Sequence, residues 1–519
     1  MTKPTDKKRI LWVDDEIDSL KSHIVFLESK GLEVVSAMSG DDALVLISKE
    51  NFDLVLLDEM MPGKDGLTTL EEMKEMQPHL PVVMVTKSEE ESLMDEAIGQ
   101  KIADYLVKPV NPSQVLLVIK RLLDSKKIIG SSSMRRYISE INRFNQKLYG
   151  AMTPEDWYEA ARVIAWWSLE LDEQTDVGLE QTLDGTRKEW NTEFTKYILQ
   201  RYRKWLFAKD RPALSPDVVN KYLVPRLKQK EKILFIVVDC MRLDQWMLIE
   251  PLLAELYTVQ REYYFSLLPS ATPFARNALF AGMFPDEINK LYPDNYRAQD
   301  EGSLNRQEDR FLTDNLARNG LRFNHQFKYL KIYDNTEGEA IAKRIADFYD
   351  KRIVTFVFNF LDILAHGRSN NIILKEIAGT EAAFRSLMKS WFVHSPLFSI
   401  LKSFAARNFT VVITSDHGSV LCKRGTVAHG KRSTSTNLRY KYGDNLNSNP
   451  KESVLIKKPH EWRLPPFSIA TTYILAKEDF YFVYPNNYNE MVRQFHNSFQ
   501  HGGISLEEMV VPIAVLTPR

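Results

Sequence analysis

The chain has 519 residues, of which 44% are hydrophobic and 26% charged, and its formal net charge is −1. This length exceeds one ordinary hydrophobic core, so we expect about three domains. No apolar run approaches the roughly 18 residues of a membrane-spanning helix, and the near-neutral charge gives no general nucleic-acid-binding signature, although it leaves a local basic patch open.

The start of the chain carries lysines followed by an acidic cluster, without the apolar segment of a secretory signal. Cys240 and Cys422 are the two cysteines, too few for a disulfide framework in a chain of this size. Both observations predict a cytoplasmic protein without a membrane span.

Strands and helices alternate through the first 124 residues. We predict strands at residues 9–15, 32–37, 52–63, 81–88 and 103–110, each followed by a helix. Five such units predict an α/β domain with a doubly wound parallel sheet.

Acidic residues follow two of these strands: Asp14 and Asp15 after the first, and Asp58 after the third. Clustered carboxylates repel one another unless a hard cation shares them, and Mg²⁺ prefers few carboxylates together with water and a phosphoryl oxygen. Thr86 ends the fourth strand and Lys108 the fifth, where a hydroxyl and a fixed cation can hold the remaining phosphoryl oxygens. Asp58 is then expected to be the nucleophile.

The motifs VDDE, LLDEMMPGKDG, VTKS and YLVKP closely resemble the receiver domain of two-component response regulators over residues 8–124. The resemblance implies a flavodoxin-like fold, phosphorylation on Asp58, and dimerisation through the face at residues 89–123. It also implies the roles of the other residues: Mg²⁺ ligands Asp14, Asp15 and the Glu59 backbone carbonyl, switch residues Thr86 and Tyr105, and phosphate partner Lys108.

Residues 125–208 have a hydrophobic period near 3.6, which predicts amphipathic helices. They contain no histidine, no cysteine and no glycine-rich phosphate loop. We interpret them as a helical connector.

A second alternating pattern follows, and metal-type ligands occur at the ends of its predicted strands. Asp239 ends one strand, and the Val411–Thr414 run delivers Asp416 and His417 to the loop beyond its carboxyl end, where open α/β sheets place ligands. Thr272 stands at the start of a helix expected from about Pro273, whose free N–H groups favour an anion. Further ligand types are Asp362 and His366, four residues apart, and His501 near the end.

This order of motifs resembles the PglZ-type branch of the alkaline phosphatase superfamily over about residues 230–515. The resemblance implies two Zn²⁺ sites: Asp239, Thr272, Asp416 and His417 for one ion, and Asp362, His366 and His501 for the other. Imidazole and carboxylate ligands suit Zn²⁺, and two such ions support phosphoryl or sulfuryl transfer with Thr272 as nucleophile. Each residue also has an ordinary structural alternative, such as a cap, a turn or a core histidine.

Two further features leave alternatives open. Arg276 and Asn277 are either donors to phosphate oxygens or exposed helix positions. The segment at residues 429–444 mixes basic and aromatic side chains, which suits a nucleotide or oligonucleotide substrate, but a solvated loop explains it as well; its candidate substrate-binding residues are Lys431, Arg432 and Arg439.

The three parts, at residues 1–124, 125–208 and 209–519, together resemble the response regulators of the type IX secretion system of Bacteroidota. This resemblance implies a PorY-like sensor histidine kinase, an extracytoplasmic-function sigma factor or secretion-system component as a further partner, and a homodimer formed on phosphorylation. The expected function is a phosphorylation-controlled dizinc phosphodiesterase. In the alternative, the effector is a zinc-stabilised docking module.

Overall fold

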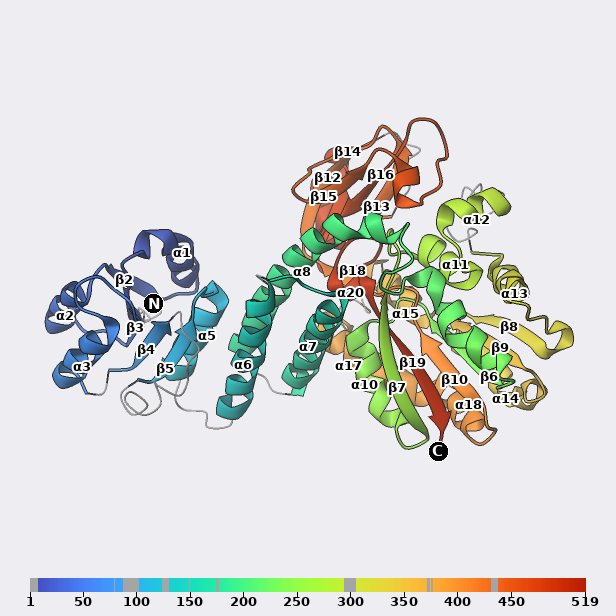
Figure 1. Ribbon diagram of the computed structural model, residues 1–519, viewed down its shortest axis with the longest axis horizontal. Helices are drawn as coiled ribbons and strands as arrows, with labels where there is room; N and C mark the ends of the chain where they lie inside the picture. Colours follow the sequence, from blue (N-terminus) through green and yellow to red (C-terminus); the bar gives the residue numbers. More distant parts are fainter. Residues whose placement is uncertain are drawn as a thin grey trace. The chain divides into compact units, whose positions relative to one another are not determined.

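A computed structural model describes residues 8–78, 80–86, 102–123, 130–148, 150–173, 177–293, 305–370, 374, 377–430 and 437–519 (Figure 1). The chain forms two compact units. One comprises Met1–Gly150 and Thr175–Thr186, and the other comprises Ala151–Gln174 and Arg187–Arg519.

The first unit contains a five-stranded parallel sheet in the order β2-β1-β3-β4-β5, which confirms the predicted doubly wound fold. Its strands are β1 (Arg9–Val13), β2 (Glu33–Ala37), β3 (Leu54–Asp58), β4 (Val82–Thr86) and β5 (Asp104–Val107). The accompanying helices are α1 (Lys21–Ser29), α2 (Gly40–Lys49), α3 (Gly66–Met76) and α5 (Pro112–Leu123).

The two faces of this sheet are both buried, because successive side chains of a strand point to opposite sides. In β1, Leu11 and Val13 belong to one apolar cluster, while Ile10 and Trp12 belong to another. Asp58 is the last residue of β3, all of whose residues are buried. It therefore lies at the carboxyl end of a strand that is covered on both faces. The predicted helix between β4 and β5, with part of the predicted dimerisation face, lies outside the described residues.

The connector consists of three helices, α6 (Gly130–Leu148), α7 (Pro154–Glu173) and α8 (Val177–Trp205). Helix α6 belongs to the first unit, and α7 belongs to the second. Helix α8 begins in the first unit and continues into the second from Arg187. Within the second unit, Trp157 of α7 packs on Phe194 of α8 with ring centroids 5.2 Å apart.

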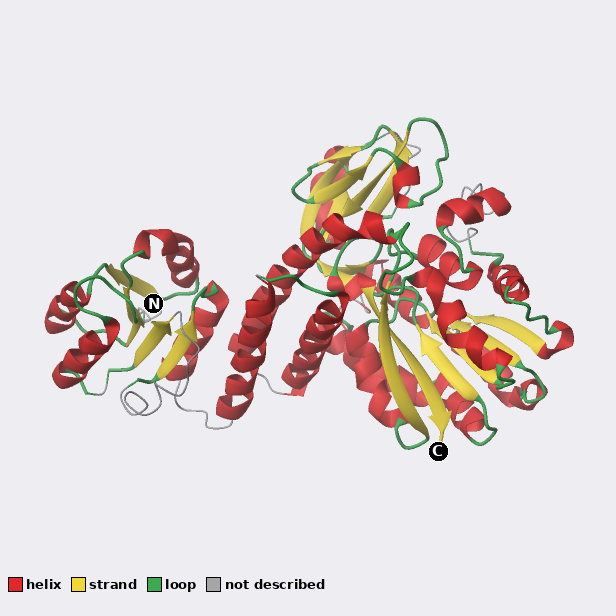
Figure 2. Ribbon diagram, viewed as in Figure 1, coloured by secondary structure: helices red, strands yellow, loops and turns green. Residues whose placement is uncertain are grey.

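The second unit is organised around a six-stranded sheet in the order β7-β19-β10-β6-β9-β8 (Figure 2). Strands β10, β6, β9 and β8 are parallel, and β19 runs antiparallel to β10 and β7. The strands are β6 (Ile233–Val238), β7 (Tyr257–Phe265), β8 (Phe327–Ile332), β9 (Ile353–Phe358), β10 (Thr410–Thr414) and β19 (Val510–Pro518). All six residues of β6 are apolar and buried, as expected for a central strand.

Helices join these strands on both sides of the sheet (Figure 1). They are α9 (Val224–Lys228), α10 (Leu243–Leu253), α11 (Thr272–Ala281), α12 (Pro285–Leu291), α13 (Glu308–Arg318), α14 (Asn335–Lys343), α15 (Phe360–Asn370), α17 (Glu381–His394), α18 (Pro396–Ala405) and α20 (Leu506–Met509). Helix α11 begins at Thr272, with Ala271 as its N-cap, within a residue of the predicted start.

Residues 420–430 and 437–500, between β10 and β19, form an inserted β region rather than a simple crossover. Three small sheets have the orders β11-β18, β14-β12-β17 and β13-β16-β15. Their strands are β11 (Val420–Cys422), β12 (Arg424–His429), β13 (Tyr440–Asp444), β14 (Asn447–Ser448), β15 (Ser453–Ile456), β16 (Thr471–Ala476), β17 (Phe480–Val483) and β18 (Ser498–Gln500), with helix α19 (Tyr488–Phe495). No helix of the described part of the chain is long and apolar enough to cross a membrane.

Candidate metal centres and phosphoacceptor site

Three carboxylates gather at the carboxyl edge of the first sheet. Asp14, Asp15 and Asp58 each offer an oxygen, and these oxygens lie within 4.8 Å of one another. The Lys108 ammonium lies 2.9 Å from Asp14 Oδ2 and 2.8 Å from Asp58 Oδ2. Burial raises the pKa of the Asp58 carboxyl above its ordinary value, because it outweighs the hydrogen bond from Lys108. The cluster has the composition of a hard-cation site with one fixed positive charge beside it.

The predicted switch residues lie close by but differ in exposure. Thr86 is buried, and its hydroxyl donates to the Glu59 carboxylate, a partner that the sequence did not suggest. Tyr105 is 43% exposed. The Glu59 carbonyl, predicted to bind Mg²⁺, accepts a 2.9 Å hydrogen bond from the Gly66 N–H. Its role as a ligand therefore depends on its second lone pair and stays a prediction.

In the second unit, Asp239, Asp416 and His417 form one buried cluster. Strands β6 and β10 are parallel neighbours with Val237 opposite Thr414, so the loops that follow place both aspartates at the same edge. The His417 Nδ1 lies 3.0 Å from the Gly418 carbonyl. A hydrogen bond there keeps the proton on Nδ1 and directs the Nε2 lone pair into the cluster.

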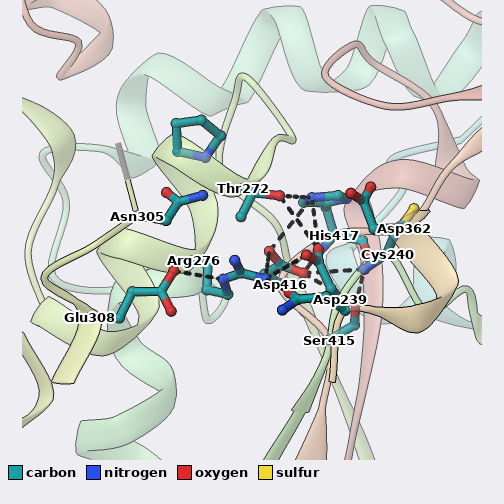
Figure 3. Close-up of polar contacts among 12 residues, drawn as sticks. Asp239, Cys240, Thr272, Arg276, Asn305, Glu308, Asp362, Ser415, Asp416 and His417 are labelled. Carbon is teal, nitrogen blue, oxygen red and sulfur yellow. Dashed lines mark hydrogen bonds and ion pairs between the residues drawn. The ribbon is translucent and has the colours of Figure 1, made fainter. Parts of the chain in front are cut away.

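Thr272 adjoins this cluster, as predicted for a nucleophile. Its Oγ1 lies 3.0 Å from His417 Nε2 and 3.4 Å from Asp239 Oδ1 (Figure 3). The expected supply of free N–H groups at the start of α11 is small, which corrects the sequence-based expectation. Pro273 has no N–H, and the N–H groups of Phe274 and Ala275 both donate to the Ala271 carbonyl.

Asp362, His366 and His501 form the second cluster. The first two lie on one face of α15, and His501 comes from the loop after β18. The two Nε2 atoms are 3.0 Å apart, and each lies 3.3 Å from Asp362 Oδ1. Burial alone would raise the pKa of Asp362, but the two imidazoles beside its carboxylate hold that pKa well below its ordinary value.

The two clusters are adjacent, since the rings of His417 and His501 stack with centroids 4.2 Å apart. Burial lowers the pKa of both histidines, which favours the neutral imidazole that a metal requires. The buried Asp416 Oδ2 has no hydrogen-bond donor among the described residues. A buried carboxylate oxygen and converging imidazole nitrogens fit two cations. Without cations, burying these groups would lower the stability of the fold.

Arg276 is not an exposed helix position, because its guanidinium is buried beneath the first cluster. It lies 2.6 Å from Asp239 Oδ2 and 2.8 Å from Glu308 Oε1 (Figure 3). Sequence reasoning missed Glu308, which stands more than 30 residues away in an ordinary helical pattern. The arrangement makes Arg276 a support for Asp239 rather than a substrate donor projecting from the surface.

The other candidate substrate-binding residues are either buried with partners inside the protein or lie outside the described residues. Asn277 is fully buried and donates to the Pro273 carbonyl in its own helix. Lys431 and Arg432 lie outside the described residues. Arg439 is fully buried in an ion pair with Glu508, and its Nη2 lies 2.5 Å from Oε2. A charged group buried in this way has its partner already, so the interpretation of Arg439 as a substrate contact was wrong.

We predict that Arg439→Met lowers the free energy of unfolding by about 3 to 5 kcal/mol, because it leaves the buried Glu508 carboxylate unpaired. Urea unfolding monitored by tryptophan fluorescence measures this change. Arg344→Met is the control, since Arg344 is 80% exposed and pairs with Asp347 at the surface; its effect should stay below about 1 kcal/mol. Equal effects of the two changes would contradict the structural role of Arg439.

Comparison with known proteins gives three family matches. Residues 218–516 match the BREX system PglZ alkaline phosphatase-like domain, residues 10–120 match the response regulator receiver domain, and residues 127–206 match the PorX response regulator linker domain.

Individual relatives resemble the first part of the chain. The transcriptional regulatory protein ResD of Bacillus subtilis is 35% identical over 119 residues, which are 23% of this chain and 49% of ResD. The alkaline phosphatase synthesis transcriptional regulatory protein PhoP of the same organism is 33% identical over 129 residues, 24% of this chain and 52% of PhoP. The chain thus spans about half the length of these curated relatives. A CheY-like receiver domain structure from Methanospirillum hungatei is 36% identical, with a TM-score of 0.22, and covers 23% of this chain and 95% of its own.

Proposed function

Because the chain belongs to the family of the BREX system PglZ alkaline phosphatase-like domain and carries a response regulator receiver domain before it, we propose that it is a two-component response regulator whose effector domain is a dizinc phosphodiesterase. The observation that carries the proposal is the convergence of two ligand clusters beside one hydroxyl. Thr272 Oγ1 lies within 3.4 Å of two members of the first cluster, and the second cluster adjoins it through the stacked histidines.

In the receiver, Asp58 would accept the phosphoryl group from a sensor histidine kinase. Asp14, Asp15 and Asp58 would hold Mg²⁺, and Lys108 would pair with a phosphoryl oxygen, for which it is already placed beside Asp58. An aspartyl phosphate adds nearly two negative charges, and Thr86 is the nearby hydroxyl able to hydrogen-bond to it after leaving Glu59. Tyr105, exposed in the structure, would turn inward, and the receiver would then form a homodimer.

In the effector, the first cluster would hold one Zn²⁺ and the second cluster the other. When bound, the ions would supply Lewis acidity and lower the pKa of a coordinated hydroxyl. Thr272 Oγ1 would lose its proton and attack phosphorus, and the bond from phosphorus to one alcohol would break, so that this alcohol leaves with a proton. Water would then hydrolyse the phosphodiester between Thr272 and the second substrate group, which releases a phosphomonoester and restores the hydroxyl. Arg276 would favour the ionised form of Asp239 against the effect of burial and keep it aimed at the cluster, while Glu308 would balance the charge of Arg276.

A nucleotide-type diester is the substrate class that we propose. Phe274, two residues after Thr272, packs edge-on against Tyr440 and Tyr442, with centroids 5.6 and 6.4 Å away. Tyr442 contacts the 41% exposed Phe467 at 4.8 Å. Phe274 and Tyr440 are buried and connect the start of α11 to the partly exposed Tyr442 and Phe467, whose rings suit the stacking of a nucleobase. Arg439 does not contribute to this proposal, because its guanidinium pairs with the buried Glu508.

The match of residues 127–206 to a PorX linker domain supports a place in control of the type IX secretion system. The partners we propose are a PorY-like kinase and an extracytoplasmic-function sigma factor or secretion-system component. We propose that the protein binds them in the cytoplasm. A zinc-stabilised docking module is the alternative for the effector, and the effect of Thr272→Ala on secretion-gene output separates the two.

Thr272→Ala should lower kcat for bis(p-nitrophenyl) phosphate by about 10³-fold or more, because alanine lacks the oxygen that attacks phosphorus. Thr272→Ser is the matched control and should keep activity within about tenfold, since it retains the oxygen. Zinc content should stay at the wild-type value in both. Normal secretion-gene output in cells carrying Thr272→Ala would favour the docking module over signalling by hydrolysis.

Asp239→Asn and Asp362→Asn should each reduce the zinc content from two ions to one per chain, because each change damages a different cluster. Mass spectrometry under native conditions counts the ions. Asp286→Asn is the control, since Asp286 is a partly buried carboxylate paired with Arg463. Loss of both ions from either variant would speak against two separate ligand sets.

Asp58→Asn should abolish phosphorylation by acetyl phosphate and the dimer that it induces, because the amide is not a nucleophile. Phosphate-affinity gels and light scattering report the two effects. Asp18→Asn changes an aspartate whose side chain is 76% exposed and should behave as the wild type. A phosphorylated Asp58→Asn protein would mean that another residue is the acceptor.

A further inference from the structure

The short helix α20 is a buried junction behind the metal clusters. Glu508 has no exposed surface, and its carboxylate is fully engaged. Oε1 accepts from the Gly503 N–H at 2.8 Å, Oε2 accepts from the Ser505 hydroxyl at 2.7 Å, and Arg439 pairs with both oxygens. A carboxylate buried to this degree is stable only with such partners, so its position is closely defined.

Glu508 contacts two loops that each carry a candidate metal ligand. Its backbone carbonyl accepts from the Gly418 N–H at 3.0 Å, and Gly418 directly follows His417. Its side chain holds Gly503, two residues after His501. One residue thus fixes the backbone beside a histidine of each cluster.

The loops are pressed closely against this junction. A Cβ atom on Gly418 would lie 1.9 Å from the Glu507 carbonyl oxygen, and one on Gly503 would lie 2.4 Å from the Ala476 carbonyl oxygen. The Gly503 carbonyl also accepts from the Ser270 hydroxyl at 2.8 Å, two residues before Thr272. Because these loops have no free space around Gly418 and Gly503, a displacement of α20 would displace the loops as well.

Helix α8 of the connector binds the same junction from the other side. Asn191 Oδ1 accepts from the Leu506 N–H at 2.7 Å, and its Nδ2 donates to Glu507 Oε2 at 3.0 Å. Arg187 Nε lies 3.3 Å from Glu507 Oε1, and its Nη1 pairs with Glu381. Asn191 is buried and Arg187 is largely buried, with 13% of its side chain exposed. Helix α8 is a continuous helix that begins in the first compact unit.

We propose that Glu508 and Asn191 are positioning residues for the effector site: Asn191 holds helix α20 against α8, and Glu508 holds the loops of His417 and His501 against α20. The inference rests on the proposed function for the identity of the site. It makes α8 the element whose movement would change both metal clusters at once. Neither residue contacts the reacting atoms, so both act through the histidines.

The test compares metal binding in the full-length protein for Asn191→Ala and Thr195→Ala. The two residues lie one helical turn apart on α8 and are 4% and 3% exposed, so loss of buried packing is similar in both. Chelator competition measures Zn²⁺ affinity, and the visible absorption of the Co²⁺-substituted protein reports ligand geometry. We expect Asn191→Ala to weaken Zn²⁺ binding by about tenfold, the size of effect seen when partners of metal ligands are removed, and to alter the Co²⁺ spectrum. Thr195→Ala should retain both wild-type values.

Glu508→Gln provides a second variant, because the amide oxygen still accepts from Gly503 while the charge that pairs with Arg439 is lost. It should weaken Zn²⁺ binding at least as much as Asn191→Ala. If both variants melt at lower temperature but keep wild-type Zn²⁺ affinity and Co²⁺ spectrum, these residues are merely structural and the proposal is overturned.

These readouts do not need turnover. A wild type that binds two ions but hydrolyses no diester would end the proposed function, and the variants would still decide the positioning role. A wild type that binds no metal would overturn both.

Discussion

The second unit depends on the burial of carboxylates at the carboxyl end of its central strands. Asp239 and Asp416 follow the neighbouring strands β6 and β10, and the sheet register gives them no freedom to separate. Burial raises the pKa of both, that of Asp239 to about 7. Such a site needs positive charge, and the described residues supply it through Arg276, which Glu308 holds in place. Two divalent cations would complete the balance.

The first unit also places carboxylates close together, but it compensates their negative charge differently. Its three carboxylates also lie at strand ends, but Lys108 enters the cluster directly and bridges Asp14 and Asp58. The ammonium lies 2.8 Å from Asp58 Oδ2, beside the carboxyl that we propose as phosphoacceptor. In both units, parallel strands concentrate negative charge at one edge, and the chemistry proposed for each follows from the cation that compensates it.

Prediction from sequence worked best where local order and spacing carry the information. The strands of the receiver, the start of α11 and the membership of both ligand clusters could be anticipated, because strand ends and family motifs lie in short segments. Arg439 and Arg276 could not, since Glu508 and Glu308 lie 69 and 32 residues from them. A basic residue near aromatic ones looks the same in sequence whether it faces solvent or a buried acid.

The sequence by itself indicated which residues are candidates for binding metal or accepting a phosphoryl group, because side-chain chemistry, strand-end position and the motifs that resemble known families are local properties. Only the tertiary structure decided which charges are internal supports, how His417 and His501 come to stack, and that α8 and α20 meet behind them. Asn191 and Leu506 are 315 residues apart. Contacts over such distances arise from the packing of whole elements, which no local pattern of residues encodes.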